Sequence, residues 1–220
     1  MDIHRKISVA VDVLLFTVEN DSLCIVLAKR DKEPFDGMFA LPGVALREDE
    51  TPGQAAERSL TERTGLSGIF LEQLYTFGSV DRDPRSRTVS IAYYALTNKE
   101  RIILPEMNGS AGLFPVSDVL SGNIPLAFDH GEMIRCGAER LKGKVNYSDI
   151  AFEFVPAEFT LPQLQRVYEI ILGEKLYKAN FRKMIAPKVE ETGSMLTGAA
   201  HRPSRLYRKK QEKGGAAWKD

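Results

Sequence analysis

A chain of 220 residues, 43% of them apolar and 27% charged, is long enough for one large or two smaller folded domains, and its composition excludes a fibrous or disordered protein. The longest apolar run, residues 7–18, is interrupted by Asp12 and is shorter than the roughly 20 residues that span a bilayer. No charged leader with a cleavage site opens the sequence. We therefore expect a cytoplasmic protein with no membrane segment.

The net charge is zero, but it is unevenly distributed. From Phe159 onward there are 13 Lys and Arg residues against 6 Asp and Glu residues, so the C-terminal part is basic and the rest is acidic. A basic segment suggests contact with a polyanion, although a charged tail is often only a solvated end. Cys24 and Cys136 are far apart, which argues against a disulfide framework and a zinc site.

The first half of the chain alternates apolar runs with turn residues. Residues 7–18 and 23–29 are predicted to pair as a β-hairpin across Asn20, Asp21 and Ser22. Further strands are predicted at 69–78, 88–96 and 111–116. Between them, Pro52 to Thr64 is predicted to be a helix with a capping box of Thr51 and Gln54 at its start and Gly65 at its end. Strands with an inserted helix favour an α+β domain with a mixed sheet.

The pattern becomes helical in the second half. A helix is predicted from Asp129 to about Lys142, ending at Gly143, and residues 146–159 are interpreted as a connector. Thr160 caps a second predicted helix that ends at Gly173, and a third follows over residues 177–186. Two short helices joined by a tight turn, with a possible hairpin of residues 189–193 and 204–210 behind them, have the plan of a winged helix-turn-helix.

The third helix carries two kinds of side chain. Its apolar stripe is predicted to face inward and consists of Tyr177, Phe181, Met184 and Ile185. The side chains left to face outward suit a DNA groove, because Arg can bond guanine, Asn can bond adenine and Lys can meet phosphates. These predicted DNA-binding residues are Lys178, Asn180, Arg182 and Lys183, joined by Arg202 and Arg205 on the hairpin. The alternative is a helical dimerisation module with a solvated basic face.

The stretch GVALREDETPGQAAERSLTERTGL, residues 43–66, resembles the Nudix box, G-x5-E-x7-R-E-U-x-E-E-x-G-U with U an aliphatic residue. The matching positions are Glu50, Arg58, Leu60, Glu62, Gly65 and Leu66. Val44 falls at the first glycine, directly after Gly43, and Ser59 and Arg63 stand where the box has two glutamates. In Nudix enzymes the clustered carboxylates hold Mg²⁺, which activates water and neutralises the pyrophosphate.

The two replacements predict weak or absent hydrolysis. Arg63 would repel a cation held by Glu62, at a cost of roughly 4 kcal/mol for like charges about 4 Å apart near a surface. We therefore expect no catalytic residue, no metal site and no required cofactor, with Mg²⁺ needed only for residual hydrolase activity. The alternative interpretation of Glu62 is an ion pair with Arg58 on the same helix.

The resemblance extends to two segments outside the box. VLAKRDKEPFDGMFALPG, with Arg30, is similar to the segment before the box in Nudix proteins that take ADP-ribose, and TFGSVDRDPRSRTVSIAYYAL is similar to a later segment of the same group. Arginine suits a pyrophosphate because its planar fork donates two parallel hydrogen bonds. The ligand-binding residues that this resemblance implies are Arg30, Glu50, Arg58, Glu62, Arg82, Asp83 and Arg85. A polar hairpin loop with ion pairs remains the alternative for Arg82, Asp83 and Arg85.

The whole arrangement, with FTLPQLQRVYEIILGEKLYKANFRKMI and HRPSRLYR near its end, resembles the Nudix-related transcriptional regulators, the NrtR family. The resemblance implies a Nudix-like α/β/α sandwich over residues 1–145, including a linking helix at about 129–143. A winged helix-turn-helix over 146–210 and a tail of 211–220 with no assigned role would follow. It also implies a homodimeric bacterial repressor that binds double-stranded operator DNA and senses ADP-ribose or a related NAD metabolite.

Three alternatives stay open at the level of the sequence. The first is an active, Mg²⁺-dependent ADP-ribose pyrophosphatase whose basic end serves another purpose. The second is a regulator of the same architecture that senses a sugar, as related branches do. The third is a scaffold protein with an inactive pocket.

Overall fold

The computed structural model describes residues 6–103, 111–196 and 203–211. Its centre is a seven-stranded mixed sheet in which β1 (Ser8–Glu19) pairs with β2 in antiparallel and with β6 in parallel orientation. The strand order is β3-β2-β1-β6-β5, with β4 paired to β1 and β7 paired to β2. The remaining strands of this sheet are β2 (Ser22–Lys29), β3 (Phe39–Ala40), β4 (Gly43–Ala45), β5 (Phe70–Phe77), β6 (Thr88–Leu96) and β7 (Ala111–Pro115).

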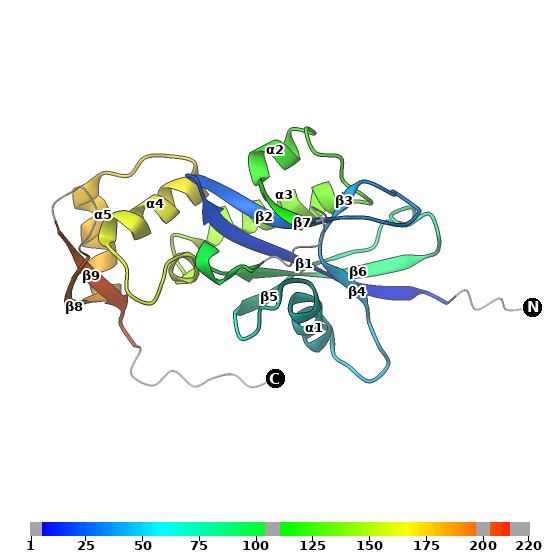
Figure 1. Ribbon diagram of the computed structural model, residues 1–220, viewed down its shortest axis with the longest axis horizontal. Helices are drawn as coiled ribbons and strands as arrows, with labels where there is room; N and C mark the ends of the chain where they lie inside the picture. Colours follow the sequence, from blue (N-terminus) through cyan, green and yellow to red (C-terminus); the bar gives the residue numbers. More distant parts are fainter. Residues whose placement is uncertain (1–5, 104–110, 197–202, 212–220) are drawn as a thin grey trace, which may run out of the picture.

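The apolar side chains of β1 point alternately to the two faces of the sheet and contribute to the core on both. Because successive side chains of a strand point to opposite faces, Val11, Val13 and Leu15 lie on one side, and Leu14 and Phe16 lie on the other. All five are fully buried. Helix α1 (Pro52–Thr64) covers the first face and α3 (His130–Lys144) the second, so the sheet is sandwiched between helices (Figure 1).

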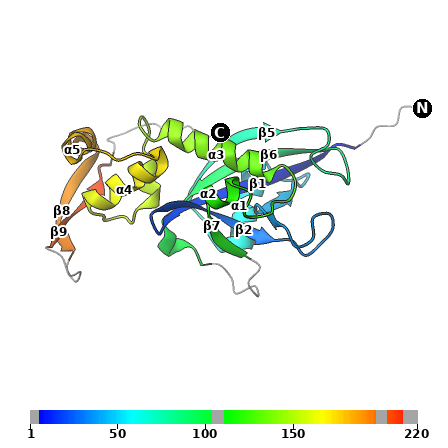
Figure 2. The same ribbon diagram turned by 90° about the horizontal axis from the view of Figure 1, so that it is seen from above.

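Helix α3 lies close to the sheet at Gly137. A side-chain carbon at this position would stand 2.7 Å from the Leu14 side chain and 3.1 Å from the Phe16 ring, so any larger residue would force the packed core to shift. Figure 2 shows α3 running along the sheet toward the end where α4 (Leu161–Leu172) packs. One apolar cluster accordingly extends from Leu14 in the sheet to Phe181 in the C-terminal part. The two parts of the chain share a continuous core.

The predicted local signals for helices and turns are confirmed where they are strongest. Thr51 forms the capping box with Gln54, and Gly65 ends α1 in the left-handed conformation with φ of 68°. Thr160 caps α4 in the same way, with Gln163 at the third helical position. The β1–β2 hairpin turns through Asn20 and Asp21, both with positive φ, which matches the right-handed twist of the flanking strands.

The C-terminal part is a winged helix-turn-helix, as predicted. Helix α5 (Lys178–Ile185) follows α4 after a short turn, and β8 (Val189–Leu196) pairs with β9 (Ser204–Lys209) to form the wing. A bridge between Phe159 and Tyr207 joins the start of this part to the wing. The shorter elements of the chain are α2 (Val116–Leu120), η1 (Lys99–Arg101), η2 (Ile150–Phe154) and η3 (Ala186–Lys188).

Three predictions of local structure were wrong. Helix α3 continues past Gly143 to Lys144, because that glycine does not adopt the left-handed conformation that stops a helix. The supposed connector contains η2, whose Ile150 and Phe152 are buried in the core. The inward stripe of α5 consists of Phe181 and Ile185 alone; Tyr177 is 83% exposed and Met184 is also exposed, because both lie beside the short buried face rather than on it.

Candidate functional site

A cavity of about 510 Å³ opens where β1 and β6 begin, between the first residues of β1, strand β4, the loop before β6 and the segment that leads into α3. Four of the seven predicted ligand residues line it: Arg30, Arg82, Asp83 and Arg85. The structure therefore brings these four side chains to one cavity. Their roles as ligand contacts stay a prediction.

Arg82 is buried, with 4% of its side chain exposed, and its guanidinium group is held inside the protein. Its Nε and Nη2 atoms donate to the two carboxylate oxygens of Asp129 at 2.9 and 2.8 Å. The same guanidinium lies 3.6 Å from Asp12, whose carboxylate also accepts a 2.6 Å hydrogen bond from the Ser90 hydroxyl. This geometry makes Arg82 a fixed part of the cavity wall.

Gly43 is the other neighbour of Asp12. It pairs with Asp12 across the β1–β4 ladder, and a side-chain carbon placed on it would lie 2.2 Å from the Asp12 carboxylate oxygen. Such a distance is impossible between unbonded atoms. The missing side chain therefore leaves the room in which the Asp12 carboxylate sits.

Arg30 and Arg85 present their guanidinium groups at the cavity. Arg85 is 56% exposed and binds Asp83 through two hydrogen bonds of 2.9 and 2.7 Å, and this partner lowers the pKa of the Asp83 carboxyl. Arg30 donates to the carbonyl oxygens of Pro34 and Lys32. These contacts orient both cations without burying Arg85.

Phe128 lies between the two arginines. Its ring centre is 4.8 Å from the Arg30 guanidinium carbon and 5.5 Å from that of Arg85, within the range of cation–π attraction. Phe35 contacts the same ring edge-on at 4.8 Å. Both phenylalanines have positive φ, 69° at Phe35 and 54° at Phe128, a conformation that bulky residues rarely adopt and that is found where a ligand site fixes the chain.

His130 completes the inner wall. Its Nδ1 accepts a hydrogen bond from the Leu41 amide at 3.0 Å, so in the neutral ring the proton resides on Nε2, which faces Asp12 at 3.9 Å. Burial lowers the pKa of His130, which favours this neutral form. The sequence reasoning missed Phe128 and His130, and also Asp12, although an aspartate that interrupts an apolar strand was a usable signal.

Glu50, Arg58 and Glu62 lie on or near α1 and do not line this cavity. Arg58 forms two hydrogen bonds with Glu50, and this arginine lowers the pKa of Glu50 to about 2. Arg58 Nη1 is also 3.7 Å from Glu62. The alternative interpretation of Glu62 as an ion-pair partner of Arg58 is thus confirmed, and the prediction that these three residues touch the ligand has no support from their position.

The two positions that depart from the Nudix box have different surroundings. Ser59 is fully buried, and its hydroxyl has no hydrogen-bond partner among the residues that the structure describes. Arg63 is exposed and lines a second cavity, of about 320 Å³, together with Arg30 and Arg85. The sequence reasoning treated Arg63 only as a residue that repels a metal. Its position adds a third guanidinium to the same rim.

Clusters of three or more His, Cys, Asp and Glu that could hold a metal ion are not found within residues 6–103, 111–196 and 203–211. In the same ranges, none of the helices is both long and apolar enough to cross a membrane.

The second candidate site is the outer face of the winged helix. Lys178, Asn180, Arg182 and Lys183 are all exposed on α5, as predicted. Arg182 and Arg205 line a groove of about 620 Å³ between α5 and the wing, and Arg205 is held there by Glu191 at 2.8 Å. Arg202, the other predicted wing residue, lies outside the described residues. A basic helix beside a basic hairpin offers the elements that read a DNA groove and its phosphates.

Comparison with known proteins assigns both parts of the chain. Residues 151–209 match the NrtR DNA-binding winged helix domain, and residues 6–135 match the NUDIX domain. The ADPR responsive transcriptional repressor NtrR of Acinetobacter baylyi is 36% identical over 201 residues, which is 90% of this chain and 80% of that protein. The chain belongs to the NrtR family.

Two solved structures of one NrtR protein, one with DNA and one with ADP-ribose, are similar to this NrtR-family chain. Shewanella oneidensis NrtR, crystallised with a 27mer DNA, superposes with a TM-score of 0.84 at 35% identity, covering 92% of this chain and 93% of that one. The Nudix domain of the same protein, crystallised with ADP-ribose, matches with a TM-score of 0.56 at 34% identity, covering 62% of this chain and 90% of that one.

An enzyme is also among the relatives of this NrtR-family chain. The ADP-ribose pyrophosphatase of Methanocaldococcus jannaschii is 35% identical over 129 residues, 58% of this chain and 71% of that protein.

Proposed function

We propose that this protein is a transcriptional repressor that binds operator DNA through α5 and the wing, and that ADP-ribose or a related NAD metabolite binds in the Nudix cavity and changes its DNA affinity. The observation that carries the proposal is the gathering of Arg30, Arg63 and Arg85 around adjoining cavities, next to the Phe128 ring. Guanidinium forks suit a diphosphate, and an aromatic ring suits a base. The relative from Acinetobacter baylyi, which is ADPR responsive, supports this assignment.

The winged helix supplies the DNA contacts. In this proposal Asn180 and Arg182 read base edges while Lys178 and Lys183 meet phosphates, and Arg205 contacts the backbone from the wing. The protein acts as a homodimer, because two helix-turn-helix units bind two half-sites of one operator. The sensor comprises residues 1–145 and the DNA-binding domain residues 146–210, in keeping with the family matches at 6–135 and 151–209.

The proposed role of the Nudix domain is binding without catalysis. Ser59 supplies a hydroxyl where the box has a carboxylate, Arg63 brings a positive charge to the second such position, and Glu62 is paired with Arg58. Mg²⁺ would need the carboxylates that these residues replace. No cofactor is required in this proposal.

The effector acts by preferring one arrangement of the two winged helices in the dimer. A ligand that binds both arrangements equally shifts nothing, however tightly it binds. A coupling free energy of roughly 1 to 3 kcal/mol would change operator affinity about 5- to 150-fold.

The test is fluorescence anisotropy on labelled DNA from upstream of the protein's own gene, at a fixed near-physiological salt concentration, with and without ADP-ribose. Tight binding that ADP-ribose changes supports the whole proposal. Tight binding that ignores ADP-ribose supports the repressor and directs the search to sugars. Absence of specific binding refutes the repressor.

An ADP-ribose pyrophosphatase is the second candidate, because the enzyme from Methanocaldococcus jannaschii is 35% identical to this chain over 129 residues. The measurement is Mg²⁺-dependent release of AMP and ribose phosphate from ADP-ribose. Turnover that is lost on Glu62→Gln would establish an active enzyme and overturn the proposal of binding alone.

A further inference from the structure

The β1–β2 hairpin connects the ligand cavity with the DNA-binding part. At one end Asp12 in β1 and Arg30, directly after β2, line the cavity. At the other end the turn at Asn20 and Asp21 projects toward α4. From Asp12 to Asp21 the strand covers roughly 30 Å at about 3.3 Å per residue. Over this length β1 is paired with β6 from Ser8 to Phe16 and with β2 from Phe16 to Glu19, so the strand is supported from the cavity to the turn and behaves as a stiff element between the two sites.

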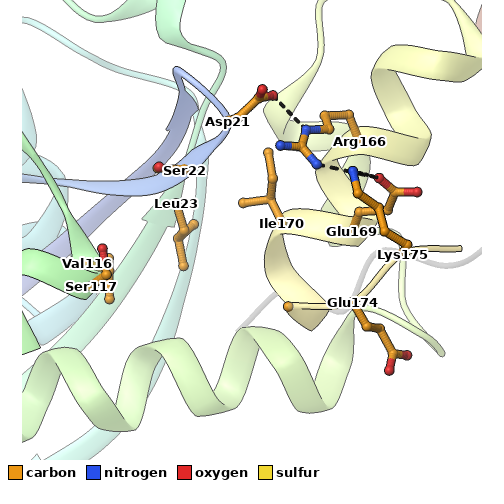
Figure 3. Close-up of a pocket in the computed structure, with 11 residues that line it drawn as sticks. Asp21, Ser22, Leu23, Val116, Ser117, Arg166, Glu169, Ile170, Glu174 and Lys175 are labelled. Carbon is orange, nitrogen blue, oxygen red and sulfur yellow. Dashed lines mark hydrogen bonds and ion pairs between the residues drawn. The ribbon is translucent and has the colours of Figure 1, made fainter.

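Asp21 contacts the DNA-binding part at the tip of this hairpin. Its carboxylate accepts a 2.6 Å hydrogen bond from Arg166 Nε of α4, and this arginine lowers the pKa of Asp21. The contact spans a gap of about 470 Å³ between the two parts of the chain (Figure 3). The gap beside it is open, so this ion pair is a polar contact between the hairpin tip and α4 at the margin of the shared core.

Glu169 contacts both Arg166 and the turn before the recognition helix α5. It lies one turn after Arg166, at 3.5 Å from Nη1, and it accepts hydrogen bonds from the Leu176 amide at 3.1 Å and from Lys175 Nζ at 3.1 Å. Leu176 precedes Tyr177, the N-cap of α5. The Leu176 amide is the largest cause that lowers the pKa of Glu169 to about 2, so the carboxylate is charged throughout the physiological range. Glu169 therefore ties Arg166 to the turn from which α5 begins.

We infer that Asp21, Arg166 and Glu169 are positioning residues that connect the ligand cavity to α5 through the β1–β2 hairpin. A ligand that shifts the cavity end of the hairpin, at Asp12 or Arg30, moves its tip and so loosens or tightens the Asp21–Arg166 contact. The change reaches the start of the recognition helix through Glu169. This inference rests on the proposed function, because it explains how the cavity and the DNA face communicate.

The test uses the full chain and the variants Asp21→Asn and Arg166→Gln, alone and together. Asn is the suitable replacement at position 21 because it tolerates the positive φ of 60° there. The measurements are operator affinity by anisotropy, with and without ADP-ribose, and ADP-ribose affinity by calorimetry in the absence of DNA. The control is Lys99→Gln, which breaks a 3.4 Å ion pair with Glu19 beside the same turn; among the described residues Lys99 forms no ion pair with α4.

Each single variant is expected to change operator affinity by roughly two- to fivefold, the range for an exposed ion pair, and to reduce the effect of ADP-ribose on operator binding. The double variant should resemble Arg166→Gln, because that variant already lacks the contact with Asp21, together with the contact to Glu169. ADP-ribose affinity without DNA should change by less than about twofold, and Lys99→Gln should behave as wild type.

Other outcomes separate this inference from the proposed function. Operator affinities and ADP-ribose responses equal to wild type in both single variants overturn the inference and leave the repressor intact. Additive effects in the double variant also overturn it, since the two residues would then act separately. If ADP-ribose has no effect on any form while Asp21→Asn still alters operator affinity, the proposed effector fails and the positioning role stands.

Discussion

Replacement of Arg82 by Met should destabilise the fold strongly, because the change leaves two carboxylates at the cavity wall without their cation. Arg82 is almost fully buried and makes two hydrogen bonds to Asp129, with Asp12 at 3.6 Å. Breaking a buried ion pair by removal of one partner costs about 3 to 5 kcal/mol. For a chain of this size, that loss corresponds to a fall in melting temperature of about 6 to 20 °C.

The assay is thermal and urea unfolding of Arg82→Met beside a matched variant, Arg85→Met. Arg85 belongs to the same loop but is half exposed, so its loss should cost less than about 1 kcal/mol. The double variant Arg82→Met, Asp129→Leu should recover part of the stability, because it removes one of the unpaired charges as well.

A melting temperature for Arg82→Met within about 2 °C of wild type would refute this reasoning, since a loss of 3 kcal/mol would be visible. So would equal losses for Arg82→Met and Arg85→Met. ADP-ribose affinity adds a second distinction: Arg85→Met should weaken it while the fold remains intact.

Three further expectations follow from the two sites. Lys178→Ala combined with Arg182→Ala should weaken operator binding at least tenfold and reduce the dependence of operator affinity on salt concentration. An operator affinity equal to wild type, measured by anisotropy, would exclude α5 as the recognition helix. Burial lowers the pKa of His130 below 6.5, so the unfolded chain binds this proton more readily than the folded chain does. The free energy of unfolding should therefore fall as the pH drops through about 6.5. Urea unfolding of His130→Gln at several pH values should lack this part of the pH dependence. Phe128→Leu should weaken ADP-ribose binding about two- to tenfold by calorimetry with little effect on ribose 5-phosphate, and equal losses for both ligands would argue against stacking on the ring.

The sequence predicted best those features of the fold that depend on residues close together in the sequence. The capping box at Thr51, the N-cap at Thr160 and the outward face of α5 are local patterns, and each was predicted correctly. The error over Ile150–Phe154 has a physical cause, because a single 3-10 turn is too short to display a period even when its apolar residues are buried. Tyr177 was misplaced because it is the N-cap residue, just before the first residue of α5; its side chain is exposed, whereas that of Phe181 is buried.

The candidate site was predictable only in part, because the cavity is formed by residues distant in the sequence. Arg82, Asp83 and Arg85 lie on one loop, and a resemblance in that loop sufficed to find them. Phe128 and His130 line the same cavity but come from the start of α3 and the residues before it, where the sequence has no motif that marks them. Conversely, helical spacing offered the Arg58–Glu62 ion pair as an alternative, but the match to the box did not reveal that Arg58 also binds Glu50.

The close approach of Gly43 to Asp12 restricts how this family can diverge. Even the methyl group of alanine at position 43 would overlap a carboxylate oxygen of Asp12, so any substitution there would force this buried carboxylate away from its partners Ser90 and Arg82. A change at position 43 becomes acceptable only after position 12 has lost its long side chain, and the loss of Asp12 would in turn remove a partner of Arg82 and Ser90. The two positions should therefore covary among relatives, as a pair that is either kept together or replaced together.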